Sequence, residues 1–370
     1  MGLNETPSSE RIQIGIFGRR NAGKSTLFNL LIGEDLAVVS DTLGTTTDPV
    51  KKAMEVLPLG PVLFIDTPGL DDEGELGEKR ITKAKQILRK IDMAVLVQST
   101  ETPDDFEEDF LEEIKKRHLP YVTVTARKNW VREDVLNEII NAYELPEERP
   151  LVRDLIDRND RVVLVIPIDK SAPKGRLILP QQQVIRDVLD AGGVPVICRE
   201  TELDATLKSM EILPKMVICD SQVFEAVNKT VPKEIPLTSF SILMARYKGD
   251  LRTQIDGAKA IKDLKEKDVI LISEGCTHKR QCKDIGAVKI PGWIKAHTGK
   301  EFVYEFTSGG EFPEDLSKYK LIIHCGGCML PAREMTYRIE TSKKCGVPIT
   351  NYGVFIAYLH GILDRASELF

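Results

Sequence analysis

A chain of 370 residues is too long for one hydrophobic core and predicts two or three domains of roughly 100 to 150 residues each. Its composition, 42% hydrophobic and 29% charged, excludes a disordered or fibrous protein. The formal net charge of -6 gives no overall attraction to phosphate backbones, which argues against nucleic acid as the main partner.

The apolar runs are all shorter than the roughly 20 residues that a membrane-spanning helix needs, and residues 1–11 are too polar for a signal peptide. We therefore expect a cytoplasmic protein without membrane contact. In such a reducing compartment, clustered cysteines bind metal or react more often than they form disulfides. Three cysteines lie apart in apolar surroundings, where we expect small buried hydrophobic residues: Cys198, Cys219 and Cys345.

Three segments follow one another along the chain. From Arg11 to about Tyr143, the runs IQIGIFG, VLFIDTPG and MAVLVQS alternate with helical patterns, which predicts a mostly parallel sheet flanked by helices. Residues 144–150 (ELPEERP) are rich in proline and acids and form a linker.

A second α/β alternation follows the linker. It contains RVVLVIPID, a helix near 182–190, VPVICRE, a helix near 203–210 and MVICD. A helix-rich stretch at 249–264 leads to a third set of strands, VILISEG, YKLIIHCGG and GVPITNYG. We see no internal repeat. The sequence predicts a three-domain α/β protein with boundaries at 1–145, 150–250 and 251–370.

The strongest motif is GRRNAGKS at residues 18–25, a complete G-x-x-x-x-G-K-S between a strand and a helix. Its glycines let the backbone turn its N–H groups toward phosphates, Lys24 reaches the outer phosphates, and the Ser25 hydroxyl binds Mg²⁺. The candidate nucleotide-binding residues of this loop are Gly18, Asn21, Ala22, Gly23, Lys24, Ser25 and Thr26.

Two further motifs complete a GTPase pattern. Asp66 to Gly69 (DTPG) ends the strand VLFI, which places the Asp66 carboxylate near Mg²⁺ and the Gly69 amide near the terminal phosphate. Residues 44–48 (GTTTD) resemble the first switch of the Era and TrmE GTPases, where Thr46, beside Thr45, matches the threonine that closes over Mg²⁺. These motifs predict GTP or GDP as ligand.

Within this pattern we assign hydrolysis to Lys24, Thr46 and Gly69. The residue after DTPG is Leu70, which cannot orient water as the glutamine of Ras-like enzymes does. In TrmE-like GTPases an asparagine at the place of Asn21 helps to bind K⁺, so the resemblance implies K⁺-stimulated hydrolysis. The simpler alternative is that Asn21 only suits the loop conformation.

One expected motif is missing. GTPases of this kind read guanine with N-K-x-D, but here the strand in LPYVTVT leads directly into Thr125-Ala126-Arg127, which resembles the last guanine-loop motif. Without the acid, the guanine N–H donors lose their partner, and selectivity for guanine should weaken. The sequence leaves open a deletion of roughly one strand and helix or an impaired nucleotide site.

A second constellation lies in the last segment. Cys276 follows the strand in DVILISEG, and HCGGC at residues 324–328 follows the strand in KLIIH. Loops after adjacent parallel strands meet at one edge of a sheet, so these two loops should lie together. The thiols of Cys276, Cys325 and Cys328 favour a 4Fe-4S cluster with one labile iron, although zinc fits the same residues.

The fourth ligand is left open. His278 and His324 either bind the metal or hydrogen-bond to neighbouring groups, and Cys282 is better explained as a spare thiol. The remaining alternative is that the three cysteines are ordinary core residues.

GTPase motifs followed by a middle α/β segment and then C-x-H and H-C-x-x-C resemble the HydF family of iron-iron hydrogenase maturation GTPases. The stretches DTLGTTTDPV, FIDTPGLDDEGELG, PIDKSAPKGRLILPQ, EGCTH, IHCGGC and PITNYGV carry the resemblance. It implies a GTPase domain, a dimerisation domain that forms a homodimer, and a cluster domain in which Cys276, Cys325 and Cys328 are the cluster cysteines.

The resemblance also implies a function. The family is a scaffold or carrier for the di-iron precursor of iron-iron hydrogenase, which radical-SAM maturases supply and the apo-hydrogenase receives. Two other classes remain: an Era- or TrmE-like GTPase of RNA modification or ribosome assembly, and a zinc-stabilised interaction protein with a decayed GTPase domain.

Overall fold

The computed structural model describes residues 6–33, 49–69, 84, 86–100, 102–126, 129–146, 149–168, 177–275 and 285–370, and only the backbone of Phe106. The chain forms two compact units, Met1–Glu147 and Glu148–Phe370, and the boundary falls in the segment where the sequence predicts a linker. The predicted α/β class is confirmed. Within the described ranges, no helix is long and apolar enough to cross a membrane.

The first unit contains a sheet with the strand order β2-β3-β1-β4-β5, in which β2 is antiparallel to β3 and the other neighbours are parallel. Its strands are β1 (Ile12–Gly18), β2 (Val50–Val56), β3 (Gly60–Asp66), β4 (Met93–Gln98) and β5 (Tyr121–Thr125). Its helices are α1 (Lys24–Ile32), α3 (Asp105–Lys116) and α4 (Arg132–Ala142).

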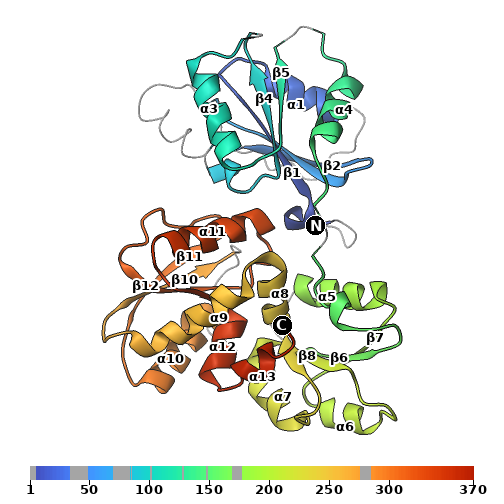
Figure 1. The fold of residues 1–370 in the computed structure, drawn as a ribbon, viewed down its shortest axis with the longest axis vertical. Coiled ribbons are helices and arrows are strands. Elements are labelled where there is room, and N and C mark those ends of the chain that lie inside the picture. Colours follow the sequence, from blue (N-terminus) through green and yellow to red (C-terminus); the bar gives the residue numbers. More distant parts are fainter. Residues whose placement is uncertain are drawn as a thin grey trace. The chain divides into compact units, whose positions relative to one another are not determined.

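Both faces of this sheet are covered, because successive residues of a strand point to opposite sides. Ile16 of β1 and Phe64 of β3 pack into the core under α1 and α4, whereas Phe17 and Ile65 pack into a second core beside α3. Figure 1 shows α3 on the opposite side of the sheet from α1 and α4. Buried central strands explain the nearly continuous apolar runs in the sequence.

The second unit contains two parallel four-stranded sheets among its described residues, with the orders β7-β6-β8-β9 and β11-β10-β12-β13. The first consists of β6 (Arg161–Val165), β7 (Val194–Cys198), β8 (Met216–Cys219) and β9 (Leu237–Ser239). The second consists of β10 (Val269–Glu274), β11 (Val303–Ser308), β12 (Tyr319–His324) and β13 (Ile349–Asn351). The helices are α5 (Leu179–Asp190), α6 (Leu203–Lys208), α7 (Phe224–Thr230), α8 (Phe240–Lys248), α9 (Leu251–Lys259), α10 (Ile290–Thr298), α11 (Ala332–Lys344), α12 (Tyr352–Leu359) and α13 (Leu363–Ser367).

One hydrophobic core joins the two sheets. It contains Val163 of β6, Val217 of β8, Ile270 of β10 and Leu321 of β12, together with Phe355 of α12. Residues 150–250 and 251–370 therefore pack together within one unit, and their separation into a dimerisation and a cluster domain stays a prediction.

The two sheets share a strand order. In both, the last strand leads into an apolar helix with the same kind of cap. The Ser239 side chain accepts a hydrogen bond from the Ile242 amide at the start of α8, and the Asn351 side chain accepts one from the Val354 amide at the start of α12. Residues 235–249 (IPLTSFSILMARYKG) and 347–361 (VPITNYGVFIAYLHG) are the corresponding stretches.

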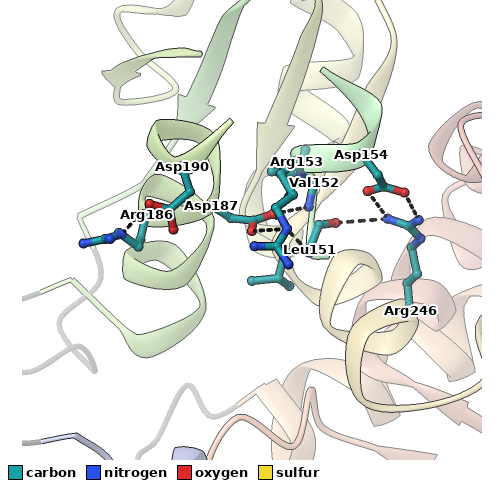
Figure 2. A network of polar contacts seen from close by, with 8 residues as sticks. All are labelled: Leu151, Val152, Arg153, Asp154, Arg186, Asp187, Asp190 and Arg246. Carbon is teal, nitrogen blue, oxygen red and sulfur yellow. Dashed lines mark hydrogen bonds and ion pairs between the residues drawn. The ribbon is translucent and has the colours of Figure 1, made fainter. Parts of the chain in front are cut away.

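A polar network fixes the start of the second unit (Figure 2). One carboxylate oxygen of Asp187, on α5, accepts hydrogen bonds from the backbone amides of Leu151, Val152 and Arg153 at 2.7 to 3.1 Å. The chain is therefore attached to α5 immediately after the linker.

Candidate functional site

The phosphate-binding loop connects β1 to α1 with the backbone that its glycines allow. Gly18, Asn21 and Gly23 have φ angles of 147°, 60° and 94°, a region that favours glycine and tolerates asparagine. Within the loop Ala22 is buried, whereas Ser25 and Thr26 at the start of α1 are exposed. The Lys24 ammonium donates to the Arg19 carbonyl oxygen at 2.6 Å and so lies along the loop.

The two predicted Mg²⁺ ligands described by the structure lie together. The Ser25 hydroxyl donates to one Asp66 oxygen at 2.8 Å, and the other Asp66 oxygen is buried without a hydrogen-bond partner among the described residues. Burial raises the pKa of Asp66, while the Ser25 hydrogen bond and the Lys24 charge lower it. A carboxylate with a free buried oxygen beside a hydroxyl suits a hard divalent cation.

The DTPG motif also lies against the phosphate-binding loop. The Thr67 hydroxyl donates to the Ile16 carbonyl of β1 at 2.7 Å and is buried. A Cβ on Gly69 would come within 3.1 Å of the Arg20 backbone, so a side chain at Gly69 would crowd the loop. Thr45, Thr46 and Leu70 lie outside the described residues.

The structure describes part of the region where the sequence lacks N-K-x-D. Strand β5 pairs directly with β4 and ends at Thr125, so the strand beside β4 is the one that leads into Thr125-Ala126. The Ala126 amide donates to the Gln98 carbonyl at 2.8 Å, which holds this turn at the end of β4. The described part of the first unit thus has a five-stranded sheet, which fits a deletion of one strand and helix.

The cysteine loop, which carries Cys325 and Cys328, follows β12. In the sequence, Cys276 comes soon after β10, the parallel neighbour of β12. The Cys325 thiol accepts hydrogen bonds from the amides of Gly275 at 2.9 Å and Gly327 at 3.4 Å. Gly275 directly follows β10, so the end of β10 and the Cys325 thiol lie at one edge of the sheet, while Cys276 itself is outside the described residues. Hydrogen bonds from backbone amides to cysteine sulfur are also a feature of iron-sulfur sites.

Both ring nitrogens of His324 have a polar partner. Its Nδ1–H donates to the Cys325 carbonyl at 2.7 Å, and its Nε2 faces the Arg338 guanidinium at 2.8 Å. Burial, followed by the charge of Arg338, lowers the pKa of His324 to about 3, so the ring is neutral. With both nitrogens occupied, the geometry favours the hydrogen-bonding alternative over direct metal binding for His324.

Two buried charged residues beside this loop were not predicted from the sequence. Arg338 of α11 is fully buried and also binds Glu334 at 2.8 Å, and Lys248 of α8 binds the Cys328 carbonyl. The sequence does carry a signal for Arg338, because Glu334 and Arg338 are four residues apart and so lie on the same face of a helix. Nothing in the sequence links Lys248 to a cysteine loop 80 residues away.

The remaining cysteine predictions have mixed outcomes. Cys219 is buried, as expected, and Cys198 is partly buried, but Cys345 is exposed at the end of α11, so that expectation is wrong. Cys276, His278 and Cys282 lie outside the described residues. Within the residues that are described, no three histidine, cysteine or acidic side chains form a metal-binding group, and the cluster ligand set stays a prediction.

Three family models match successive parts of the chain. Residues 13–127 match the 50S ribosome-binding GTPase family, residues 151–249 the hydrogen maturase F dimerization domain, and residues 252–369 the hydrogen maturase F tetramerization domain.

Relatives are similar in shorter stretches. GTPase Der of Wolinella succinogenes is 34% identical over 157 residues, 40% of this chain and 33% of the relative. GTPase Era of Heliobacterium modesticaldum is 35% identical over 129 residues, 34% of this chain and 43% of the relative. The chain thus spans less than half the length of either. The G domain of the T. maritima FeoB iron transporter aligns with 36% of this chain and 99% of that chain at 18% identity, with a TM-score of 0.25.

Proposed function

The chain belongs to the hydrogen maturase F family, and from this premise we propose that it is a GTP hydrolase and an iron-sulfur scaffold that assembles or delivers the di-iron precursor of iron-iron hydrogenase. Its partners in this role are radical-SAM maturases, which supply the precursor, and the apo-hydrogenase, which receives it. The dimerization and tetramerization families support self-association, including the predicted homodimer.

The nucleotide half of the proposal rests on the Ser25 and Asp66 pair. Mg²⁺ would be held by the Ser25 hydroxyl, with Asp66 beside it and Thr46 closing from the switch. Lys24 neutralises charge on the outer phosphates of GTP, and the Gly69 amide donates to the terminal phosphate. Loss of that phosphate frees Thr46 and Gly69, which makes the nucleotide a switch for partner binding.

The cluster half rests on one observation, the two amide hydrogen bonds to the Cys325 thiol at the edge shared by β10 and β12. Cys276, Cys325 and Cys328 would hold a 4Fe-4S cluster, with His324 fixing the loop through the Cys325 carbonyl. When bound, such a cluster supplies an iron with an exchangeable position to which a precursor can attach.

The deciding experiment is anaerobic reconstitution with iron and sulfide, followed by electron paramagnetic resonance of the reduced protein. We expect a 4Fe-4S signal from the native chain and its loss in Cys325→Ala. Cys345→Ala is the matched control, because that cysteine is exposed and follows the last residue of α11, and it should keep the signal. Bound zinc without a cluster in the native chain would contradict the scaffold and favour a structural zinc site.

A further inference from the structure

Lys248 connects α8 to the cysteine loop. The residue is 3% exposed, and its ammonium donates to the carbonyl oxygens of Cys328 at 3.1 Å and Leu330 at 2.9 Å. A buried ammonium is costly unless its donors are satisfied, so these two carbonyls are strong partners. The loop position of Cys328 is therefore set by a side chain from the other sheet's half of the unit.

The Lys248 contacts add to the hydrogen bonds that hold the Cys325 end of the loop and to the turn from Gly327 to Leu330. Gly326 and Gly327 separate Cys325 from Cys328, and a Cβ on Gly326 would meet no atom within 4 Å. Gly327 adopts a positive φ of 63°. Glycine pairs leave a backbone many conformations, and external hydrogen bonds restrict them.

The same helix is tied to the start of the second unit. Two residues before Lys248, the Arg246 guanidinium forms a bidentate pair with Asp154 and donates to the Leu151 carbonyl at 3.3 Å. Figure 2 shows this pair beside the Asp187 contacts that hold the same segment. A bidentate arginine pair constrains orientation as well as distance. One end of α8 therefore binds both the segment after the linker and the cysteine loop.

We propose that Lys248 is a positioning residue for Cys328, and that α8 transmits displacements of residues 151–154 to the cysteine loop through Arg246 and Lys248. Residues 151–154 lie near the start of the second unit, which begins at Glu148. The inference rests on the proposed function only for the identity of the group that the loop holds. The loop contacts themselves are independent of that group.

The first test uses the apo-protein and the rate at which a small iodoacetamide reagent modifies Cys328, followed by mass spectrometry. Lys248→Met should raise this rate about tenfold, because the loop loses two charge-assisted hydrogen bonds. Lys248→Arg keeps charge and donors and should restore most of the protection. Lys229→Met removes an exposed lysine that pairs with Glu225 and is the matched control, with no expected change.

Asp154→Asn tests transmission along α8. It removes the charge that orients Arg246 and should raise the Cys328 rate by a smaller factor, about threefold. An unchanged Cys328 rate in Lys248→Met, with the native thermal midpoint, would overturn the positioning role. An unchanged rate in Asp154→Asn alone would overturn transmission.

The second test measures the reduction potential of the reconstituted cluster. A cation beside the loop favours the reduced form, which carries more negative charge, so Lys248→Met should lower the potential and Lys248→Arg should not. If Lys248 had only a structural role, Lys248→Met and Lys248→Arg would have the same reduction potential. If no cluster forms in the native chain, the proposed function fails, while the modification rates still decide the role of Lys248.

Discussion

The indole ring of Trp130 lies against Gly23 of the phosphate-binding loop, where a Cβ on Gly23 would come within 3.0 Å of the ring. The indole N–H donates to the Thr125 carbonyl at 2.9 Å, which fixes the ring after β5. The chain therefore has an aromatic face beside the nucleotide loop in the region that lacks N-K-x-D. An aromatic face can stack on any base, but it does not read the hydrogen-bonding edge that distinguishes one base from another.

We predict weak selection among purine nucleotides. The affinities for GTP, ITP and XTP should agree within about tenfold, whereas a site that hydrogen-bonds the base edge discriminates by roughly 10⁴ or more. Intrinsic fluorescence in a Trp293→Phe background, where Trp130 is the remaining tryptophan, measures binding of each nucleotide. A preference for GTP above a thousandfold would contradict the prediction and require another guanine-reading group.

The contact between Ser25 and Asp66 predicts that replacing Asp66 impairs Mg²⁺-dependent hydrolysis more than nucleotide binding. Asp66→Asn should lower Mg²⁺-dependent GTP hydrolysis by at least about a hundredfold, because a neutral amide is a poor ligand for this cation. Nucleotide binding in excess chelator should change little, since the loop amides and Lys24 are retained. Mg²⁺ titrations of hydrolysis and of binding separate the two effects. Equal losses in both would indicate a folding defect instead.

Much of the fold was predictable because buried parallel strands produce long apolar runs. The runs containing β1, β3, β10 and β12 were found in this way. Strand β11 was missed because VYEFTS is mixed in polarity and only partly buried. The strand order that the two halves share was not predicted from the sequence.

The site was predictable only where a motif fixes spacing along the chain. The GRRNAGKS loop and the DTPG turn meet as expected, since both follow neighbouring strands of one sheet. The contacts of Lys248 with the Cys328 loop depend on packing between two sheets, which local sequence does not encode. The His324 and Arg338 contact joins the end of β12 to the helix that follows it, and the sequence carried no motif for that pair.

The buried Arg338 and Glu334 pair predicts a large stability effect. Their side chains are 0% and 2% exposed, and Arg338→Met would leave the Glu334 charge buried without its partner. We expect a loss of about 3 to 5 kcal/mol in the free energy of unfolding, measured with urea, and a smaller loss in the double variant with Glu334→Leu. An Arg338→Met protein as stable as the native chain would contradict this prediction.

The isolated cysteines predict an order of thiol reactivity. At pH 8, Cys345 should react first because it is exposed, Cys198 more slowly, and Cys219 only on unfolding. Burial raises the pKa of Cys198 and raises that of Cys219 further, so a smaller fraction is thiolate at a given pH. The Cys198 rate should therefore keep rising above pH 9. A plateau below pH 9 would contradict this assignment.

Asn21 allows a direct test of K⁺ stimulation. Its φ of 60° suits asparagine or glycine, so the conformational role and a role of the amide oxygen are both open. Asn21→Gly keeps this backbone conformation and removes only the side chain. If the oxygen helps to bind K⁺, hydrolysis of the native chain should be faster in KCl than in NaCl, and the variant should lose that difference while it retains nucleotide binding. Equal rates in both salts for the native chain would leave Asn21 with the conformational role alone.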